Sequence, residues 1–385
     1  MDDLKIIVAC SSCFHDNGLI RDAMDIGTEK EGLCPQCGSE EGYKLSKEQL
    51  ERLAHRFFVW GSLRRAKYGG APLVQFNSHR KGSELKVPSW LESDTELFVE
   101  LLGIGFFYYG PRLWMLGEVE PLKALEDPAS RAGIVDLILK EYPVHEMEPS
   151  EAFYRVRTCI EDPTQESQFD SPPVEMSGSG RLDTPDMPVL YGSPDLDVCV
   201  HECRVSAEDE IHVARLRPAK TLKLLNLAVL LKESRSITEF ESLDMAIHML
   251  FLAAKHAYPI SRTISVAARA SGFHGLIYPS YFSMLRVGAM PFQTTLGISN
   301  RRIPEYRGYE QSFAVPNLGL FGRPVEEGVV SVECINRLIL RRVSYDYHFG
   351  PILPGGFTPI LRTHLKRPIM AVEVCHAETK KILRG

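Results

Sequence analysis

Four cysteines near the start of the chain have the spacing of metal ligands. Cys10 and Cys13 form one Cys-x-x-Cys pair, and Cys34 and Cys37 form a second pair 20 residues further on. A tetrahedral zinc ion takes four thiolate or imidazole ligands, and each pair supplies two of them. Four protein ligands leave no open coordination position, so the ion would hold the segment together and would not catalyse. We predict a structural zinc site; a redox pair or four unliganded core cysteines are the alternatives.

A second group of residues is unusual in its combination of side chains. Arg181 follows a flexible Gly-Ser-Gly, Tyr191 ends a short apolar stretch, Glu202 lies in the helix expected next, and Ser280 stands after another apolar stretch. Each residue alone has an ordinary structural explanation, as a solvated arginine, a wet helix face or a turn serine. Only their combination is unusual, an arginine after glycines followed by a tyrosine, a glutamate and a serine in this order.

The elements expected to position these residues differ between the two halves of the chain. The region 46–148 is mainly helical by its apolar spacing, with irregular connections around 68–88. Helices are expected after Ser46 and Ser93, each three residues before a Gln or Glu as in a capping box, and after Asp127.

Strands and helices alternate in the second half, which gives the fold class α+β. Strands are expected over 153–157, 188–191, 211–216, 221–227, 275–278 and 329–335, and helices over 194–203, 241–257 and 263–270. The run 161–177 is polar and rich in proline, and we expect it to be a loop too polar to pack by itself. It directly precedes Gly178, so we expect it to lie over a binding cleft and to become ordered with ligand.

The predicted organisation has four parts. They are a four-cysteine zinc ribbon at 1–45, a mainly helical domain at 46–148, a mixed domain at 149–345 and a C-terminal extension at 346–385 without an assigned fold.

Composition narrows the classes of protein. Of the 385 residues 44% are hydrophobic and 24% charged, which is typical of a globular protein and excludes a largely disordered one. The net charge of −6 disfavours nucleic-acid binding driven by bulk positive charge. No stretch approaches the roughly 20 apolar residues of a membrane span, and the N-terminus does not resemble a secretory signal. We expect a cytoplasmic protein with neither membrane nor nucleic-acid partners.

Taken together, the second group of residues resembles the RES family, which is named for its Arg, Glu and Ser. The matching pattern is Arg181 after glycine, Tyr191 in a Pro-Val-Leu-Tyr stretch, Glu202 in the following helix and Ser280 in a Tyr-Pro-Ser motif. The family's early Tyr-Arg pair is matched by Arg155 and the tyrosine before it. The resemblance covers about 150–325, and the part before it resembles the extension of some longer bacterial RES proteins.

The resemblance implies an ADP-ribosyltransferase-like domain that binds NAD+ and breaks the bond between nicotinamide and ribose. Many members are toxins that lower cellular NAD+ and are inhibited by an antitoxin. This chain is much longer than those toxins, which leaves a defence or regulatory role open. We expect hydrolysis or phosphorolysis of NAD+, with an inhibitory antitoxin or regulatory protein as partner and the oligomeric state open. The alternatives are a protein ADP-ribosyltransferase and a non-enzymatic zinc-ribbon interaction protein.

The chemistry of the side chains suggests a role for each. Glu202 would stabilise the positive charge that develops on the ribose ring, as carboxylates do in glycoside cleavage. Arg181 and Arg155 would bind the diphosphate of NAD+, because the guanidinium fork suits phosphate oxygens. Tyr191 would offer a ring to nicotinamide and a hydroxyl to ribose. Ser280 would hydrogen-bond a ribose or amide group, and no base partner that would make it a nucleophile is visible.

Two absences in the sequence agree with this interpretation. The chain has no G-x-G-x-x-G after a strand and no Walker lysine motif, which fits a nucleotide consumed as substrate. The region 46–148 also lacks an Arg and a His four to six residues apart, the spacing that a HEPN-like RNase would need.

Overall fold

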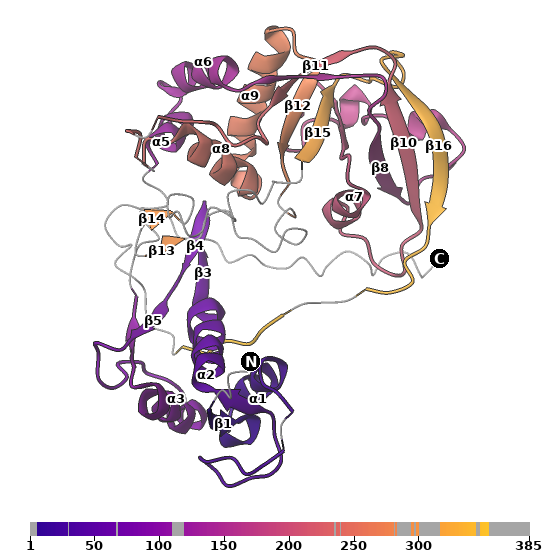
Figure 1. Cartoon of the computed structure of the whole chain (residues 1–385). Coiled ribbons are helices and arrows are strands. Elements are labelled where there is room, and N and C mark those ends of the chain that lie inside the picture. The colour runs from indigo at the N-terminus through magenta and orange to yellow at the C-terminus, as the bar shows by residue number, and fades with distance from the viewer. Residues whose placement is uncertain are drawn as a thin grey trace, which may run out of the picture. The chain divides into compact units, whose positions relative to one another are not determined.

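The computed structural model describes residues 6–29, 31–66, 68–109, 119–234, 236–238, 240–280, 282, 294–295, 298–299, 316–343 and 347–353 (Figure 1). The chain divides into two compact units. One comprises Met1–Phe58, Val74–Pro111 and Gly350–Gly385, and the other Val59–Leu73 and Arg112–Phe349. Both contain helices and strands, which confirms the α+β class. The predicted extension at 346–385 lies outside the described residues from 354 onward.

The cysteine segment of the first unit contains a helix that the sequence pattern did not predict. Strand β1 (Ile7–Cys10) pairs antiparallel with β2 (Lys44–Ser46), and helix α1 (Asn17–Ile26) lies between the two cysteine pairs in the chain. Asp16 caps α1, because its carboxylate accepts the Leu19 N–H at 3.0 Å. The apolar face of α1 is short, so the sequence of this polar segment did not indicate a helix.

The remaining elements of this unit are two helices and a pair of strands. Helix α2 (Lys47–Ala54) begins with the predicted capping box at Ser46 and continues into a π-helical turn. Helix α3 (Ser89–Leu102) begins after Pro88, so the second predicted capping box is wrong: proline sets the start, and Ser93 lies inside the helix.

Strands also occur in the region expected to be mainly helical. β5 (Val74–Asn77) pairs with β6 (Gly105–Tyr108), and β3 (Leu63–Ala66) pairs with β4 (Gly69–Pro72) of the second unit. The core of the first unit includes four phenylalanine rings, and Phe58 and Phe106 lie 4.3 Å apart by ring centroids.

A five-stranded sheet forms the centre of the second unit. Its order is β7 (Val144–Met147), β11 (Leu222–Asn226), β12 (Gly275–Pro279), β15 (Pro316–Phe321) and β9 (Val189–Gly192). Only β11 and β12 are parallel among these pairs. One apolar cluster joins Leu225 and Leu276 of the sheet to helices α5 (Glu120–Glu126), α6 (Arg131–Glu141), α8 (Leu243–Leu252) and α9 (Tyr258–Ala270). Burial of this apolar area is the main stabilising contribution to the unit.

A three-stranded sheet lies against the other face of the central sheet. Its antiparallel order is β16 (Val330–Leu338), β10 (Ile211–Pro218) and β8 (Phe153–Thr158). A second apolar cluster joins it to Leu224 and Leu318 of the central sheet. Tyr154 and Ser193 exchange backbone hydrogen bonds of 2.8 and 3.1 Å, which link β8 to the chain just after β9.

Three expectations differ from the observed elements of this unit. The helix expected over 241–257 ends at Leu252, and after a 3₁₀ turn α9 starts at Tyr258 with Pro259 in its first turn. The centre of the 161–177 loop also packs: Phe169 is fully buried in an apolar cluster. Finally, β7 precedes residue 149 but pairs with β11; the four-part division itself stays a prediction.

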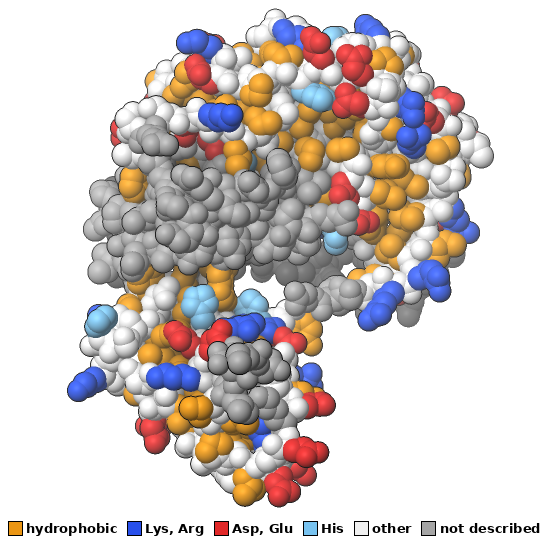
Figure 2. Space-filling model, viewed as in Figure 1, with side chains coloured by type: hydrophobic (Ala, Val, Ile, Leu, Met, Phe, Trp, Pro, Cys, Tyr) orange, Lys and Arg blue, Asp and Glu red, His pale blue; other side chains and the backbone are white. Residues whose placement is uncertain are grey.

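No helix in the described ranges combines the length and the apolar character needed to cross a membrane. On the face of the second unit seen in Figure 2, basic and acidic side chains are interspersed.

Candidate functional site

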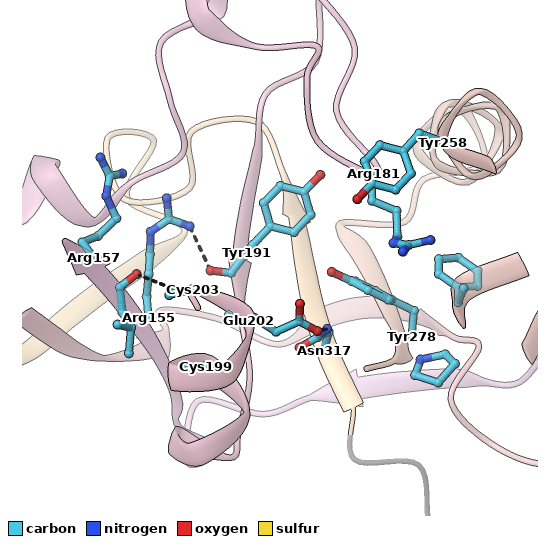
Figure 3. A pocket seen from close by; sticks show the side chains of 14 residues that line it. Arg155, Arg157, Arg181, Tyr191, Cys199, Glu202, Cys203, Tyr258, Tyr278 and Asn317 are labelled. Carbon is cyan, nitrogen blue, oxygen red and sulfur yellow. Dashed lines mark hydrogen bonds between the residues drawn. The ribbon is translucent and has the colours of Figure 1, made fainter. Parts of the chain in front are cut away.

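A pocket of about 330 Å³ opens beside β8, β9 and the end of helix α7 (Leu196–Glu202). Its volume is within the range of about 300–1,000 Å³ that is usual for ligand sites. It is lined by Arg155, Val156, Arg157, Arg181, Tyr191, Gly192, Cys199, Glu202, Cys203, Phe251, Tyr258, Tyr278, Pro279 and Asn317 (Figure 3). Three arginines and one glutamate line it, so the described walls favour an anionic ligand.

Glu202 is held by donors from two strands of the central sheet. Helix α7 begins at Asp195, whose side chain accepts the N–H groups of Asp197 and Val198, and the helix ends at Glu202. The Ser280 hydroxyl, just after β12, donates to Glu202 Oε1 at 2.7 Å, and the Asn317 amide of β15 donates to the same oxygen at 2.6 Å. Ser280 is fully buried, whereas Glu202 remains accessible to solvent. The two donors fix the direction of a carboxylate that faces the pocket.

Arg181 lies across the pocket from β8 and is packed against aromatic rings (Figure 3). Its guanidinium carbon is 4.8 Å from the centroid of the Tyr258 ring, a cation–π distance. Its Nη atoms donate to the carbonyls of Leu250 and Ala253 at 3.3 and 2.8 Å. These bonds occupy two of the five N–H donors of an arginine, and three remain for a ligand.

Asp183, two residues after Arg181, organises the glycine loop. Its carboxylate accepts the N–H groups of Gly178 and Gly180 and the hydroxyl of Tyr191, the last at 2.7 Å. Burial opposes the ionisation of Asp183, but the hydrogen bonds from Tyr191, Gly180 and Gly178 outweigh it and lower its pKa. Burial also raises the pKa of Tyr191 well above its usual value. The Tyr191 hydroxyl therefore serves mainly to hold the loop.

Side chains of helix α9 form hydrogen bonds with the backbone of the same loop. The Ser261 hydroxyl donates to the Arg181 carbonyl at 2.7 Å, and Arg262 donates from Nε and Nη2 to the Gly180 carbonyl at 2.9 and 2.6 Å. The backbone around Arg181 is thus fixed by hydrogen bonds from Asp183 and from α9.

The other predicted arginine, Arg155, is buried and bound to the backbone. It donates to the carbonyls of Tyr191 and Asp170, both at 2.9 Å. Burial, followed by the nearby charge of Arg157, lowers the pKa of Arg155 to about 10, so it remains a cation at neutral pH.

Two cysteines, Cys199 of α7 and Cys203 just after it, line the pocket close to Glu202 but are poorly suited to nucleophilic chemistry. Burial raises the pKa of Cys199 to about 12 and also raises that of Cys203. Their sulfurs donate to the carbonyls of Tyr154 and Val156 at 3.2 and 3.5 Å, so they pack α7 against β8.

The structure brings the predicted site residues together: Arg155, Arg181, Tyr191 and Glu202 line one pocket, and Ser280 meets it through Glu202. The sequence analysis missed Asn317, Asp183 and Arg157. Asn317 gives no local signal, because it is an isolated amide more than 100 residues from its partner. Asp183 could have been found as an acid that follows a glycine loop, and Arg157 as the residue two after Arg155 on the same strand face.

The four cysteines of the first unit come together as a possible metal centre. Their sulfur atoms all lie within 4.8 Å of one another, and the nearest pairs are 3.6 to 3.8 Å apart. A tetrahedron with Zn–S bonds of 2.3 Å has edges of about 3.8 Å, so the donor set fits zinc in number, type and spacing. Gly38, just after the second pair, has a φ of +73°, a conformation that favours glycine.

A buried lysine braces the turn that carries the second cysteine pair. Lys44 is 1% exposed, and its Nζ donates to the carbonyls of Ser39, Glu40 and Glu41 at 3.1, 3.0 and 3.2 Å. These bonds close the loop between the last cysteine and β2, and so help to keep the four sulfurs together.

Residues 152–289 match the family model of the RES domain. No curated protein matches the chain. Among solved structures, the crystal structure of the M. tuberculosis MbcT–MbcA toxin–antitoxin complex is similar over 53% of this chain and 91% of the other chain, with 12% identity and a TM-score of 0.29. A TM-score this low supports no argument about this chain.

Proposed function

From the RES domain that this chain carries, we propose that residues 152–289 form the main part of an enzyme that cleaves the nicotinamide–ribose bond of NAD+. The observation that carries the proposal is Glu202, a solvent-accessible carboxylate held by Ser280 and Asn317 in a pocket with three arginines. Hydrolysis or phosphorolysis is the proposed outcome, in a toxin or defence effector.

Glu202 is the proposed catalytic residue. Departure of nicotinamide leaves positive charge on the ribose ring, and a fixed carboxylate stabilises that charge as it develops. Ser280 and Asn317 both bind Oε1, and Oε2 accepts no hydrogen bond from any described residue. Oε2 is therefore the oxygen that would face the ribose. Ser280 and Asn317 would act as positioning residues, and nothing requires Ser280 to be a nucleophile.

Arg181 is the proposed binding residue on the other side of the pocket. Its remaining donors would hydrogen-bond oxygen atoms of the dinucleotide that are the same before and during bond cleavage. Such binding is expressed in KM more than in kcat. The rings of Tyr191, Tyr258 and Tyr278 offer flat surfaces for nicotinamide, whereas the Tyr191 hydroxyl is already bound to Asp183.

Incubation of the full chain with NAD+ tests the proposal. With and without inorganic phosphate, mass spectrometry should detect nicotinamide together with ADP-ribose for hydrolysis or a phosphorylated ADP-ribose for phosphorolysis. Protein-bound ADP-ribose would identify the alternative, an ADP-ribosyltransferase. If no nicotinamide is released from NAD+ under any of these conditions, the proposed function is wrong.

A second protein is proposed as the controlling partner. An enzyme that consumes NAD+ in the cytoplasm endangers its own cell, so an antitoxin or regulatory protein would restrain it. Co-purification of a stoichiometric partner that suppresses NAD+ cleavage is the expected result.

A further inference from the structure

Arg157 is the one arginine of the pocket to which the sequence analysis gave no role. It lies two residues after Arg155 on β8, so both side chains leave the same face of the strand. Arg157 is half-buried, and its side chain forms no hydrogen bond or ion pair with any residue that the structure describes. A half-buried guanidinium without a counter-charge is costly, and an anionic ligand would relieve that cost.

The other two arginines differ from Arg157. Arg155 and Arg181 each donate to two backbone carbonyls. The nearby carboxylate of Asp170 is occupied as well, because it accepts the N–H groups of Ser171 and Glu326. Among the described residues that line the pocket, Glu202 is the only acid. Arg157 therefore has all its donors available for a ligand.

The position of Arg157 indicates which part of a ligand it would bind. In Figure 3, Arg157 and Arg181 lie on opposite sides of the pocket, with Tyr191 and Glu202 between them. If Glu202 faces the ribose of the bond that breaks, a group bound by Arg157 lies to one side of that ribose. In NAD+, the negative charge next to the nicotinamide ribose is the diphosphate.

We infer that Arg157 binds the diphosphate of the dinucleotide and so selects substrates that carry phosphate. This inference rests on the proposed function. It also changes the role of Arg155, which the sequence analysis expected to bind the diphosphate. Arg155 becomes a buried support for the strand that carries Arg157. Arginine suits this task, since its planar fork can donate two hydrogen bonds to one phosphate.

Steady-state kinetics of Arg157→Gln with NAD+ and with nicotinamide riboside, which lacks phosphate, tests this inference. The loss of charge-assisted hydrogen bonds should raise KM for NAD+ about 10- to 100-fold and change kcat little. KM for the riboside should stay the same. Arg157→Lys, which keeps the charge without the fork, should lie in between. The matched control is Arg337→Gln, a mostly exposed arginine of the same sheet that does not line the pocket.

Binding of ADP and adenosine, measured by calorimetry, separates the two proposals. If the wild-type protein binds ADP more tightly than adenosine through Arg157 but never cleaves NAD+, the proposed function fails and this inference stands. If NAD+ is cleaved and Arg157→Gln leaves its KM unchanged, this inference is wrong. The same holds if the variant raises only the KM for inorganic phosphate as co-substrate, or if it weakens the riboside as much as NAD+.

Discussion

At the scale of single residues, Glu202 takes its orientation from partners far away in sequence. Ser280 follows β12 and Asn317 belongs to β15, yet both donate to the same carboxylate oxygen. An oxygen with two such donors is held against rotation, so the other oxygen has a defined direction. A carboxylate fixed in advance stabilises developing charge without having to reorganise.

Glu202→Gln separates binding from catalysis. Glutamine keeps an oxygen that can accept from Ser280 and Asn317, so the fold should survive. It removes the charge, which should lower kcat by about 10²–10³ while NAD+ still binds. Turnover should be compared with Glu208→Gln, an exposed glutamate shortly after α7. Near-normal turnover of Glu202→Gln, with an unchanged melting temperature, would contradict the assigned role.

Asp183→Asn should change how stability depends on pH. Hydrogen bonds lower the pKa of Asp183 in the folded protein below its ordinary value of 3.8. Its ionised form therefore stabilises the fold above that ordinary value, and this contribution disappears as pH falls through the folded pKa. At pH 7 the variant should lose about 1–3 kcal/mol, because one of the buried donors loses its acceptor.

Denaturant unfolding across pH checks this expectation. The stability difference between wild type and Asp183→Asn should be full at pH 7 and shrink below about pH 4. Asp186→Asn, an exposed acid of the same segment, is the control and should show no such dependence. A gap that stays constant down to low pH would mean that the ionised Asp183 does not hold the loop.

At the scale of elements, the loop 178–183 is held by hydrogen bonds from several parts of the second unit. The Asp183 carboxylate accepts hydrogen bonds from the Gly180 N–H and the Tyr191 hydroxyl. Ser261 and Arg262 of α9 donate to carbonyls of the loop. Arg181 is therefore placed by backbone contacts, and a change in the loop backbone should move it.

Gly180→Ala tests this placement. A Cβ at Gly180 would come within 2.1 Å of Asp183 Oδ1 and 2.7 Å of the Tyr191 hydroxyl, so the loop must shift. We expect weaker NAD+ binding and a lower melting temperature. Gly133→Ala, in helix α6, meets nothing within 4 Å and should stabilise the protein by about 0.5–1 kcal/mol. Equal affinity for NAD+ in both variants would refute the loop's role.

Elements were predictable where their signal is local. The capping box at Ser46 and the strand 275–278 were predicted because cap chemistry and apolar runs act over a few residues. The break between α8 and α9 was missed, since apolar residues continue across it and only Pro259 marks the new start. For the site, the resemblance to the RES family predicted the Arg, Tyr, Glu and Ser that line or support the pocket. Asn317 could not be predicted from the sequence, because only the pairing of β15 with β12 brings it close to Glu202.

At the scale of the whole molecule, the cysteine segment belongs to a unit larger than a zinc ribbon. The buried Asp94 of α3 accepts the backbone N–H groups of His15 and Asp16, at 2.9 and 2.7 Å. Helix α3 is thereby tied to the chain just after the first cysteine pair. A metal ion at the four sulfurs would stabilise helices as well as the cysteine turns.

Removal of zinc should accordingly loosen much of the first unit. Metal analysis of the full chain should give about one zinc per chain. A chelator, or acid that protonates the thiolates, should release it and speed amide exchange in α1 and α3. Cys34→Ser should do the same, whereas Cys159→Ser, an exposed cysteine elsewhere, should keep the full zinc content. Protein that holds no zinc, or exchange in α3 that ignores its loss, would count against this view.

The order of strands in the central sheet has a consequence for synthesis on the ribosome. β15 lies between β12 and β9, although it follows β9 by more than 100 residues in the chain. A nascent chain that has not yet released Pro316–Phe321 lacks the strand that joins these two, and it lacks Asn317 at the pocket. Since a domain folds as a unit once its last strand is available, the pocket is completed only after β15 has left the ribosome. A chain that stops before Pro316 would therefore carry no complete site.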